Sequence, residues 1–369
     1  MDEKKSPNID LLFFGRNCNL NCNHCYCQEG SGSIKKTDIK KDIEIARKVQ
    51  QKNPDSKVYL YPKEIATSIE ASELFREFGQ KQILTNGVVL SDRIVQALKE
   101  SGIERVKTTL FGDYESHALL YNITFQQYLK IIENIDRYVK EGFRVVVNTV
   151  ITRSNITSIK RLIKICCDLG VSEISFLRLR PTGNARSMDQ NEFLRKKDII
   201  KTVELIETIK QNKPPMYLSY NMSFGPDFFG KSSRQAQEKT SKNKLGWKGE
   251  KKYICPIIDM NYLGVSMRSG DVFGCLFAME ENDFKLGKLD FTSGKITLFE
   301  KDFMNSGILS ANLRGNCQKD ACPYHDVCMG GCRSLAYVIA KEKGEKNPIY
   351  AGMDYCITKT KEEIYGQKT

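Results

Sequence analysis

The chain has 369 residues, of which 40% are hydrophobic and 28% are charged, and its formal net charge is +12. This length exceeds the usual size of a single hydrophobic core, so we expect one large domain and one smaller one. The first eight residues are mostly polar or charged and no run of about 18 apolar residues occurs, which argues against a signal peptide or membrane span and predicts a cytoplasmic protein.

The positive charge is consistent with nucleic-acid binding or with an acidic peptide partner. The basic residues are scattered along helix-like segments such as 35–52 and 195–201, as expected for solvated helix faces. No basic stripe is interleaved with aromatic residues, so we do not expect a nucleic-acid interface.

The first 210 residues alternate strand-like runs with longer amphipathic segments. Runs rich in β-branched and aromatic residues predict strands at 9–14, 57–61, 82–85, 105–110, 144–151 and 173–180. Helical spacing of apolar residues predicts helices at 38–51, 64–78, 91–100, 125–141, 156–169 and 191–211. Ser91 is a candidate N-cap, and Gly102, Gly142 and Gly170 stand where helices should end.

Six successive β-α units predict an α/β fold with a parallel sheet, either laid open or curved into a partial (β/α)6 TIM-like barrel. Functional groups in such folds gather at the carboxyl ends of the strands. Residues 212–254, with two prolines and a lysine-rich stretch, predict a linker that contains one strand or helix. We therefore divide the chain into a barrel at 1–211, a linker at 212–254 and a cysteine-rich domain at 255–369.

Three cysteines, Cys18, Cys22 and Cys25, directly follow the first predicted strand. In a cytoplasmic protein, clustered cysteines indicate metal ligands rather than disulfides. Three thiolates at this spacing suit a [4Fe-4S] cluster in which one iron has no protein ligand and can bind a substrate. A zinc site completed by His24 or Cys27 is the alternative.

Seven more cysteines lie in the C-terminal part, where glycines interrupt the pattern and little apolar core can form. Seven ligands are too many for one cluster and suit two clusters, one held by four cysteines and one by three. A pair of zinc sites would use a similar number. Bound metal is the expected source of stability for this segment.

With these two cysteine sets, the chain resembles a radical S-adenosylmethionine (radical SAM) enzyme with a C-terminal SPASM domain, over nearly its whole length. The N-terminal spacing matches the superfamily, and the C-terminal order matches SPASM except that four residues separate Cys317 and Cys322 instead of two. Further family-like segments follow the predicted strands: 85–87, 109–112, Asn148 and 178–186.

The resemblance implies three [4Fe-4S] clusters, S-adenosylmethionine (SAM) as cosubstrate, and an electron donor such as flavodoxin or ferredoxin. It implies that Cys18, Cys22 and Cys25 hold the SAM cluster. The other ligands would be Cys255, Cys275 and Cys332 for the first auxiliary cluster and Cys317, Cys322, Cys328 and Cys356 for the second. The implied SAM contacts are His24, Glu64, Thr109, Asn148 and Arg178.

The sequence also departs from the family pattern. Pro62 and Lys63 replace two glycines before Glu64, and the family's His-Asp-x-x-Arg motif becomes a segment that begins with His117 and ends with a tyrosine. Arg178 could replace the missing arginine as partner of the SAM carboxylate, or it could be a surface arginine at a strand end.

Three cysteines fall outside the expected ligand sets. Cys166 and Cys167 occupy an apolar helix pattern that predicts packing. Cys27 lies two residues beyond the N-terminal loop, where it could give a hydrogen atom to a substrate radical or could pack in the interior.

The resemblance implies a peptide or protein substrate. One branch makes formylglycine in sulfatases and uses an aspartate after the second SPASM cysteine. Leu276 occupies that position, although Asp271, Glu280 or Asp283 could act as base if the loop folded differently.

We therefore expect the other branch, which installs crosslinks, thioethers or epimerised centres in ribosomally made peptides. The first strand begins at residue 9, so leader recognition would need a separate protein or a sheet edge. Small-molecule SPASM chemistry and a non-enzymatic zinc or iron-sulfur module are the alternatives.

Overall fold

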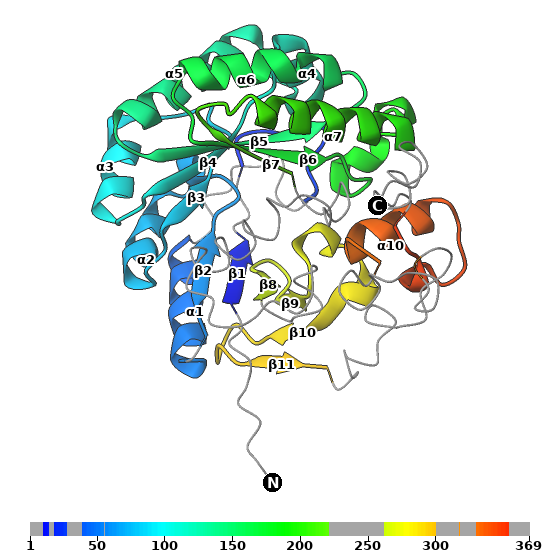
Figure 1. The fold of residues 1–369 in the computed structure, drawn as a ribbon. Helices are drawn as coiled ribbons and strands as arrows, with labels where there is room; N and C mark the ends of the chain where they lie inside the picture. The colour runs from blue at the N-terminus through cyan, green and yellow to red at the C-terminus, as the bar shows by residue number, and fades with distance from the viewer. Residues whose placement is uncertain are drawn as a thin grey trace.

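The structure is a computed structural model that describes residues 10–14, 18–27, 39–54, 56–220, 262–299, 317 and 330–353. Two β-sheets organise these residues, one with five strands and one with six. The five-stranded sheet lies under an arc of helices, and the six-stranded sheet lies across from it (Figure 1). No helix among the described residues is long and apolar enough to cross a membrane.

The five-stranded sheet is parallel throughout, as the alternating pattern predicts. Its strands run in chain order: β3 (Gln82–Leu84), β4 (Arg105–Thr109), β5 (Arg144–Ile151), β6 (Glu173–Arg178) and β7 (Tyr217–Tyr220). Its outer face is covered by α3 (Asp92–Glu100), α5 (Phe125–Lys140), α6 (Ile159–Asp168) and α7 (Lys196–Gln211) (Figure 1). Val145 and Val147 are fully buried in this core with Ile131 and Ile135 of α5. The α/β class and the parallel sheet are thus confirmed.

Local signals in the sequence fix the helix ends. The Ser91 side chain accepts the backbone N–H of Ile94 and begins α3, and Thr124 and Gln127 form a reciprocal capping box at the start of α5. Gly102, Gly142 and Gly170 have φ values of 76°, 88° and 71°, which glycine adopts without steric cost as helices end. These predicted boundaries are confirmed.

The six-stranded sheet joins segments from both ends of the chain. Its order is β11 (Ile296–Leu298), β10 (Lys285–Leu289), β9 (Asp271–Phe273), β8 (Tyr262–Ser266), β1 (Asp10–Phe14) and β2 (Val58–Tyr61). β1 pairs in parallel with both β2 and β8, whereas β8 to β11 are antiparallel neighbours. α1 (Ile39–Lys52) packs beside β2. The cysteine-rich segment is therefore built onto the first strand of the predicted barrel.

Two features differ from the sequence prediction, and a third agrees with it. The expected helix at 64–78 is two 3-10 turns, η1 (Ile65–Thr67) and η2 (Ile69–Ala71), followed by α2 (Ser72–Glu77). The Glu64 side chain accepts the Ala66 N–H and directs the first turn. A further helix, α4 (Tyr114–Tyr121), begins at the Asp113 cap, and β7 supplies the element expected after residue 212.

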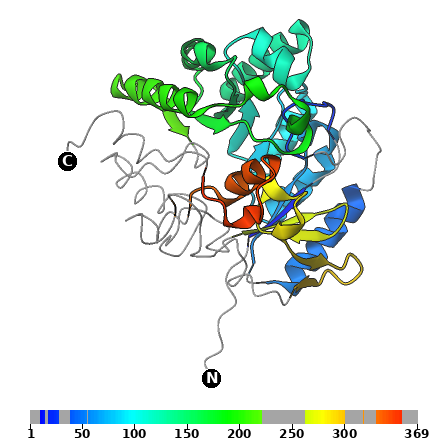
Figure 2. The same cartoon turned by 90° about the vertical axis from the view of Figure 1, so that its right-hand side faces the viewer.

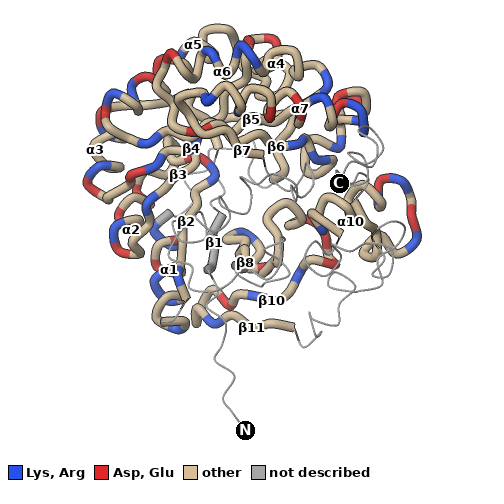
Figure 3. The backbone as a smooth tube through the Cα atoms, in the orientation of Figure 1, with Lys and Arg blue, Asp and Glu red and all other residues tan. Residues whose placement is uncertain are grey.

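A second, smaller core surrounds α10 (Arg333–Glu342). Its buried members include Cys275, Phe284, Cys332 and Leu335. The turned view shows α10 beside β8 to β10, on the side away from α1 (Figure 2). Basic and acidic residues alternate along the described outer helices, as expected for solvated faces (Figure 3).

Candidate cofactor site

The loop at 18–27 carries Cys18, Cys22 and Cys25 and directly follows the segment of β1. Cys18 is buried and the other two are half-buried. The loop is held on three sides by segments that follow other strands, so its position is set by long-range contacts.

The first side is the end of α4. The backbone N–H of Asn23 donates to the Leu120 carbonyl at 2.9 Å, and the Asn23 side chain donates to the Leu119 carbonyl at 2.7 Å. His24 Nδ1 lies 2.8 Å from the same Leu120 oxygen, so this nitrogen carries the proton. These groups use carbonyls that a helix end leaves without intrahelical partners. The His24 ring also stacks on Tyr121 at 5.3 Å, and burial lowers its pKa.

The second side is the segment after β6. Asn184 donates its backbone N–H to the Cys25 carbonyl and its side chain to the Cys22 carbonyl, both at 2.9 Å. Gly183 has a φ of 58°, and a Cβ there would overlap the Cys25 carbonyl oxygen. Only glycine allows this close approach. The family-like segment 178–186 thus supports the cysteine loop through its backbone.

The third side comes from the ends of β2 and β3. Lys63 Nζ donates to the Cys27 carbonyl at 2.9 Å. The Asn86 amide donates to the Asn19 side chain at 2.7 Å and lies 3.9 Å from Cys18 Sγ. Lys63, which replaces a glycine of the family pattern, therefore has a structural contact of its own with the loop.

Glu64 joins these two strand ends beneath the loop. It is 1% exposed, and its Oε1 accepts the Thr85 hydroxyl at 2.7 Å and the Ala66 N–H at 3.1 Å. Its Oε2 accepts the Asn86 N–H at 2.6 Å. Burial raises the pKa of Glu64, although the hydrogen bonds from Asn86, Ala66 and Thr85 oppose that rise. The carboxylate is thus a buried hub that already accepts three hydrogen bonds.

The donor set of the loop suits an iron-sulfur cluster. Burial raises the pKa of Cys18 and Cys22, and Cys25 raises both further because the charges of the three thiolates interact. A bound cationic metal centre would remove this penalty and hold the sulfurs as thiolates. Among the described residues, no three His, Cys, Asp or Glu side chains converge as they would around one metal ion.

The predicted SAM contacts fall on different faces of the sheet. One row of neighbouring residues crosses β4, β5 and β6 and consists of Thr109, Asn148 and Ser175. This row lies on the face of the sheet opposite to the helices, whereas the buried Val147 lies on the face toward the helices. This row crosses the sheet from the last residue of β4 through the middle of β5 to the third residue of β6. The sequence alone does not indicate Ser175, since its place in the row depends on the register of β6.

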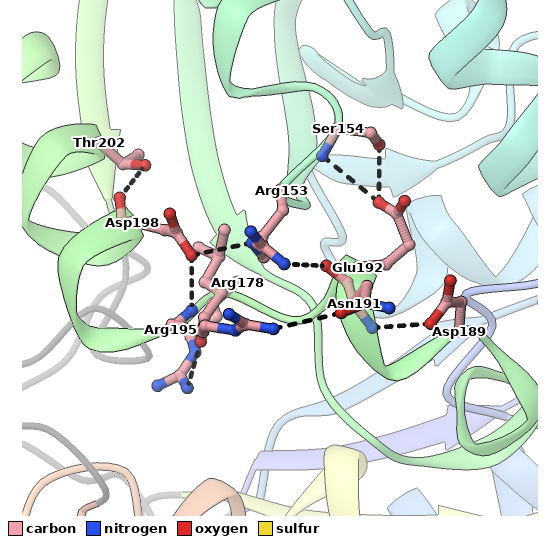
Figure 4. A network of polar contacts seen from close by, with 10 residues as sticks. Arg153, Ser154, Arg178, Asp189, Asn191, Glu192, Arg195, Asp198 and Thr202 are labelled. Atoms are coloured by element: carbon pink, nitrogen blue, oxygen red, sulfur yellow. Dashed lines mark hydrogen bonds and ion pairs between the residues drawn. The ribbon is translucent and has the colours of Figure 1, made fainter.

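Arg178 lies on the other face of β6 from Ser175, on the same face as Phe176, and its side chain is 5% exposed. Its Nη2 lies 3.5 Å from the Leu194 carbonyl. In Figure 4 it lies among the polar contacts of α7 and the loop after β5, where Arg153 pairs with Asp198 at 3.2 Å and donates to the Asn191 carbonyl. Arg178 is therefore buried, and its contact with SAM stays a prediction.

Cys27 is half-buried at the end of the loop, and its carbonyl accepts from the Cys25 thiol at 3.0 Å as well as from Lys63. Of the two helix cysteines, Cys166 is fully buried in the main core, in agreement with a packing role, and Cys167 packs against that core.

A second pair of thiols, Cys275 and Cys332, lies in the small core around α10. Arg180 Nη1 is 3.3 Å from Cys332 Sγ and 3.0 Å from Ser334 Oγ. Burial acts to raise the pKa of Cys332, but the Arg180 charge and the hydrogen bonds outweigh it, so that this pKa is lowered. Burial and the Cys332 charge raise the pKa of Cys275.

Only one of the other five predicted ligands lies among the residues that the structure describes. Cys317 is described and half-buried. Four predicted ligands lie outside the described residues: Cys255, Cys322, Cys328 and Cys356. The assignment of ligands to two auxiliary clusters stays a prediction.

The acidic residues near Leu276 are engaged in other contacts. Asp271 pairs with Lys288 at 2.8 Å, and the Tyr337 hydroxyl donates to Asp283 at 2.7 Å. Glu280 pairs with Arg186 at 3.4 Å. Each carboxylate thus has a structural partner, which weighs against its use as the catalytic base of formylglycine formation.

An ion-pair network joins the segment after β6 to the small core. Arg186 pairs with Glu281, which is 1% exposed and also accepts from Lys341 of α10 at 2.6 Å. Because Glu281 is buried, this network contributes more to positioning than an exposed pair would.

Comparison with known sequences finds a likeness to a known family in the N-terminal part of the chain. Residues 12–166 match the model of the radical SAM superfamily. A probable GTP 3',8-cyclase of Sulfurisphaera tokodaii is 30% identical over 173 residues, which are 45% of this chain and 54% of that enzyme, so the match spans about half of that relative. An AdoMet-dependent heme synthase of Methanosarcina barkeri is 23% identical over 92% of this chain and 93% of its own length.

Comparison with solved structures extends the likeness to the whole fold. SuiB of Streptococcus suis, in a crystal structure with its precursor peptide SuiA, has a TM-score of 0.67 and 16% identity, over 95% of this chain and 76% of that chain. The enzyme anSMEcpe with bound AdoMet has a TM-score of 0.61 and 16% identity, over 93% and 90% of the two chains. At these identities the likeness is one of fold.

Proposed function

We propose that this chain, which carries a radical SAM domain over residues 12–166, modifies a ribosomally made peptide by abstracting a hydrogen atom from it. The observation that carries the proposal is the cysteine loop, held at the carboxyl ends of the strands by α4, Asn184 and Asn86. A [4Fe-4S] cluster bound there would supply one electron for the reductive cleavage of SAM to methionine and a 5′-deoxyadenosyl radical, and that radical would abstract the substrate hydrogen atom and become 5′-deoxyadenosine.

The task of the protein is placement. Cys18, Cys22 and Cys25 would ligate the cluster, and the backbone contacts at Leu120 and Asn184 keep the loop in one position. Thr109 and Asn148 lie on the inner face of the sheet, where they would contact SAM together with Glu64. Glu64 is buried and Thr109 and Asn148 are half-buried, which favours exclusion of water from a reactive radical.

A peptide substrate is supported by fold. The fold of SuiB, which was crystallised with a precursor peptide, resembles that of this chain over 95% of this chain. The charge of +12 suits an acidic leader sequence. We further propose a (β/α)6 partial barrel at 1–211, a SPASM domain at 255–369 with two auxiliary clusters, a cytoplasmic location, and a flavodoxin or ferredoxin as electron donor. Crosslinks, thioethers and epimerised centres are the candidate products.

A second candidate substrate is a tetrapyrrole. Relatives named AdoMet-dependent heme synthase align with 92% and 94% of this chain at 23% and 21% identity. Such an enzyme would use the same cysteine loop but would need an apolar, planar binding space rather than a groove for an extended peptide.

The chemistry is tested by anaerobic reconstitution followed by iron analysis and measurement of 5′-deoxyadenosine. We expect about twelve irons per chain if three four-iron clusters assemble, and SAM cleavage that requires a reductant. Cys22→Ala removes one of the three proposed ligands of the first cluster and should lose about four irons. Because SAM cleavage depends on that cluster, 5′-deoxyadenosine formation should fall at least about a hundredfold.

Cys167→Ala is the matched control, since Cys167 is half-buried in α6, where it packs against the core. It should retain iron and SAM cleavage. Zinc in place of iron in the wild-type chain would overturn the proposal.

The substrate is tested separately. Short peptides encoded beside the gene and a set of tetrapyrroles are incubated with the reconstituted enzyme, SAM and reductant, and products are followed by mass spectrometry. Turnover of a peptide with a mass change supports the first candidate. Decarboxylation or oxidation of a tetrapyrrole without peptide turnover supports the second.

A further inference from the structure

One short segment, residues 180–186 after β6, contacts both cysteine sites. Gly183 and Asn184 lie against the backbone of the N-terminal loop, as described above. Arg180 turns the other way and reaches Cys332, which is 152 residues further along the chain. The two sites are therefore held in one frame by a few consecutive residues.

Arg180 is only 8% exposed, and its contacts fix the plane of the guanidinium group. Nη1 donates to Ser334 Oγ at 3.0 Å and lies 3.3 Å from Cys332 Sγ, while the guanidinium carbon lies 4.1 Å from the centre of the Phe277 ring. Phe277 is two residues from Cys275, and its ring also contacts Tyr26 of the cysteine loop, at 5.0 Å between ring centres. Arg180 thus lies between the thiol of Cys332 and the ring of Phe277, which contacts Tyr26 of the N-terminal cysteine loop.

We propose that Arg180 is a positioning residue of the second cysteine site, where it holds the Cys332 thiolate and raises the reduction potential of an iron-sulfur cluster ligated by Cys275 and Cys332. This inference rests on the proposed function, which places an auxiliary cluster there.

The physical argument is electrostatic. A guanidinium donates a charge-assisted hydrogen bond to a thiolate, and such bonds are stronger than those between neutral groups. Reduction adds negative charge to a cluster, and a nearby buried cation stabilises the reduced form because little water screens it. Hydrogen bonds to the ligand sulfurs act in the same direction. Arg180 supplies both effects, whereas Ser334 supplies only a polar contact, at 3.6 Å from Cys332 Sγ.

The test is a redox titration of the reconstituted enzyme monitored by electron paramagnetic resonance. Arg180→Met keeps the length of the side chain and removes its charge. At the potential where the second cluster of the wild type is half-reduced, we expect the variant ratio of reduced to oxidised cluster to be at least about tenfold lower, equivalent to about 59 mV for a one-electron couple. The potential of the first cluster should not change.

Three further variants make the result specific. Arg180→Lys keeps the charge without the planar contact to Phe277 and should give a smaller shift, and Ser334→Ala should shift the potential in the same direction by less than Arg180→Met. Arg195→Met removes an equal charge from a residue whose guanidinium donates to Asn191 and should leave both potentials unchanged. If Arg180→Met fails to fold, Arg180→Lys and Ser334→Ala still decide the question.

The outcomes separate this inference from the proposed function. An intact second cluster with an unchanged potential in Arg180→Met and Ser334→Ala overturns the role of Arg180 and leaves the proposed function standing. A wild-type chain that binds only about four irons overturns the auxiliary cluster and the role of Arg180 with it, while SAM cleavage still reports on the first site.

Discussion

Individual side chains around the cysteine loop have structural tasks that their residue types do not reveal. His24 is a candidate SAM contact by sequence, yet its Nδ1 is committed to the Leu120 carbonyl and its ring to Tyr121. Glu64 accepts three hydrogen bonds, of which the two from Thr85 and Asn86 join the end of β2 to the end of β3. Any contact of these residues with SAM would be made in addition to those tasks, through the remaining ring nitrogen or lone pairs.

His117 provides a prediction about pH at the residue scale. It is fully buried in α4, its Nε2 accepts the Phe111 N–H at 2.9 Å, and its ring packs against Tyr121 and Tyr128. The pKa of His117 is lowered to about 3, mainly by burial and also by the charge of the nearby His24, while Asp113 opposes the shift. The unfolded chain therefore binds a proton below about pH 6.5 that the folded chain does not bind.

Neutral His117 therefore contributes fully to the free energy of unfolding above about pH 6.5. This contribution is lost as the pH falls toward about 3, because the unfolded chain takes up the proton first. At pH 5.5 the wild type should lose about 1.4 kcal/mol of unfolding free energy through this group. His117→Gln, which keeps an acceptor but does not titrate, should lack that loss. Anaerobic urea unfolding at about pH 7.5 and about pH 5.5 measures the difference, and equal pH dependence in both proteins would contradict the assignment.

At the scale of elements, the segment after β6 depends on the close approach of Gly183 to the cysteine loop. A methyl group there would overlap the Cys25 carbonyl oxygen, and the φ of 58° adds strain. We expect Gly183→Ala to displace the segment and to lower the iron content of the first site. The overlap should cost about 1–3 kcal/mol beyond the strain of the positive φ.

Gly142→Ala is the matched control for that variant. Gly142 has a φ of 88°, and an added methyl group would meet no atom within 4 Å, so that only backbone strain results. This strain should cost about 1–2 kcal/mol. Denaturant unfolding and iron analysis of both variants give the comparison. Equal losses of stability and iron in the two would show that the contact with Cys25 is unimportant.

The elements also show where local signals fail. Ser91 and Gly142 set helix ends through contacts within a few residues, so these ends are predictable. The segment 64–78 has a helical apolar pattern, but the Glu64 carboxylate bonds to Thr85 after β3 and to Ala66, and it divides the segment into short turns. A partner that follows another strand cannot be found from periodicity.

At the scale of the whole molecule, β1 is an interior strand because β8 returns from residue 262 to pair with it. A chain cut after residue 220 would leave one edge of β1 unpaired, and open parallel edges favour association. We expect this fragment to aggregate, as measured by size-exclusion chromatography with light scattering, and co-expression of residues 221–369 to restore a discrete species. A monomeric fragment with cooperative unfolding would contradict this view of the sheet.

The sequence by itself determined the α/β class, the alternation of strands and helices, the Ser91 cap and the candidate ligands, since alternation, capping and cysteine spacing are properties of short stretches. Only the tertiary structure decided which residues meet. Arg180 and Cys332 are brought together across 152 residues, and the alternation of β6 turned Arg178 away from the row of Thr109 and Asn148. Register and long-range packing depend on the whole chain, because each contact must be compatible with every other element in the fold.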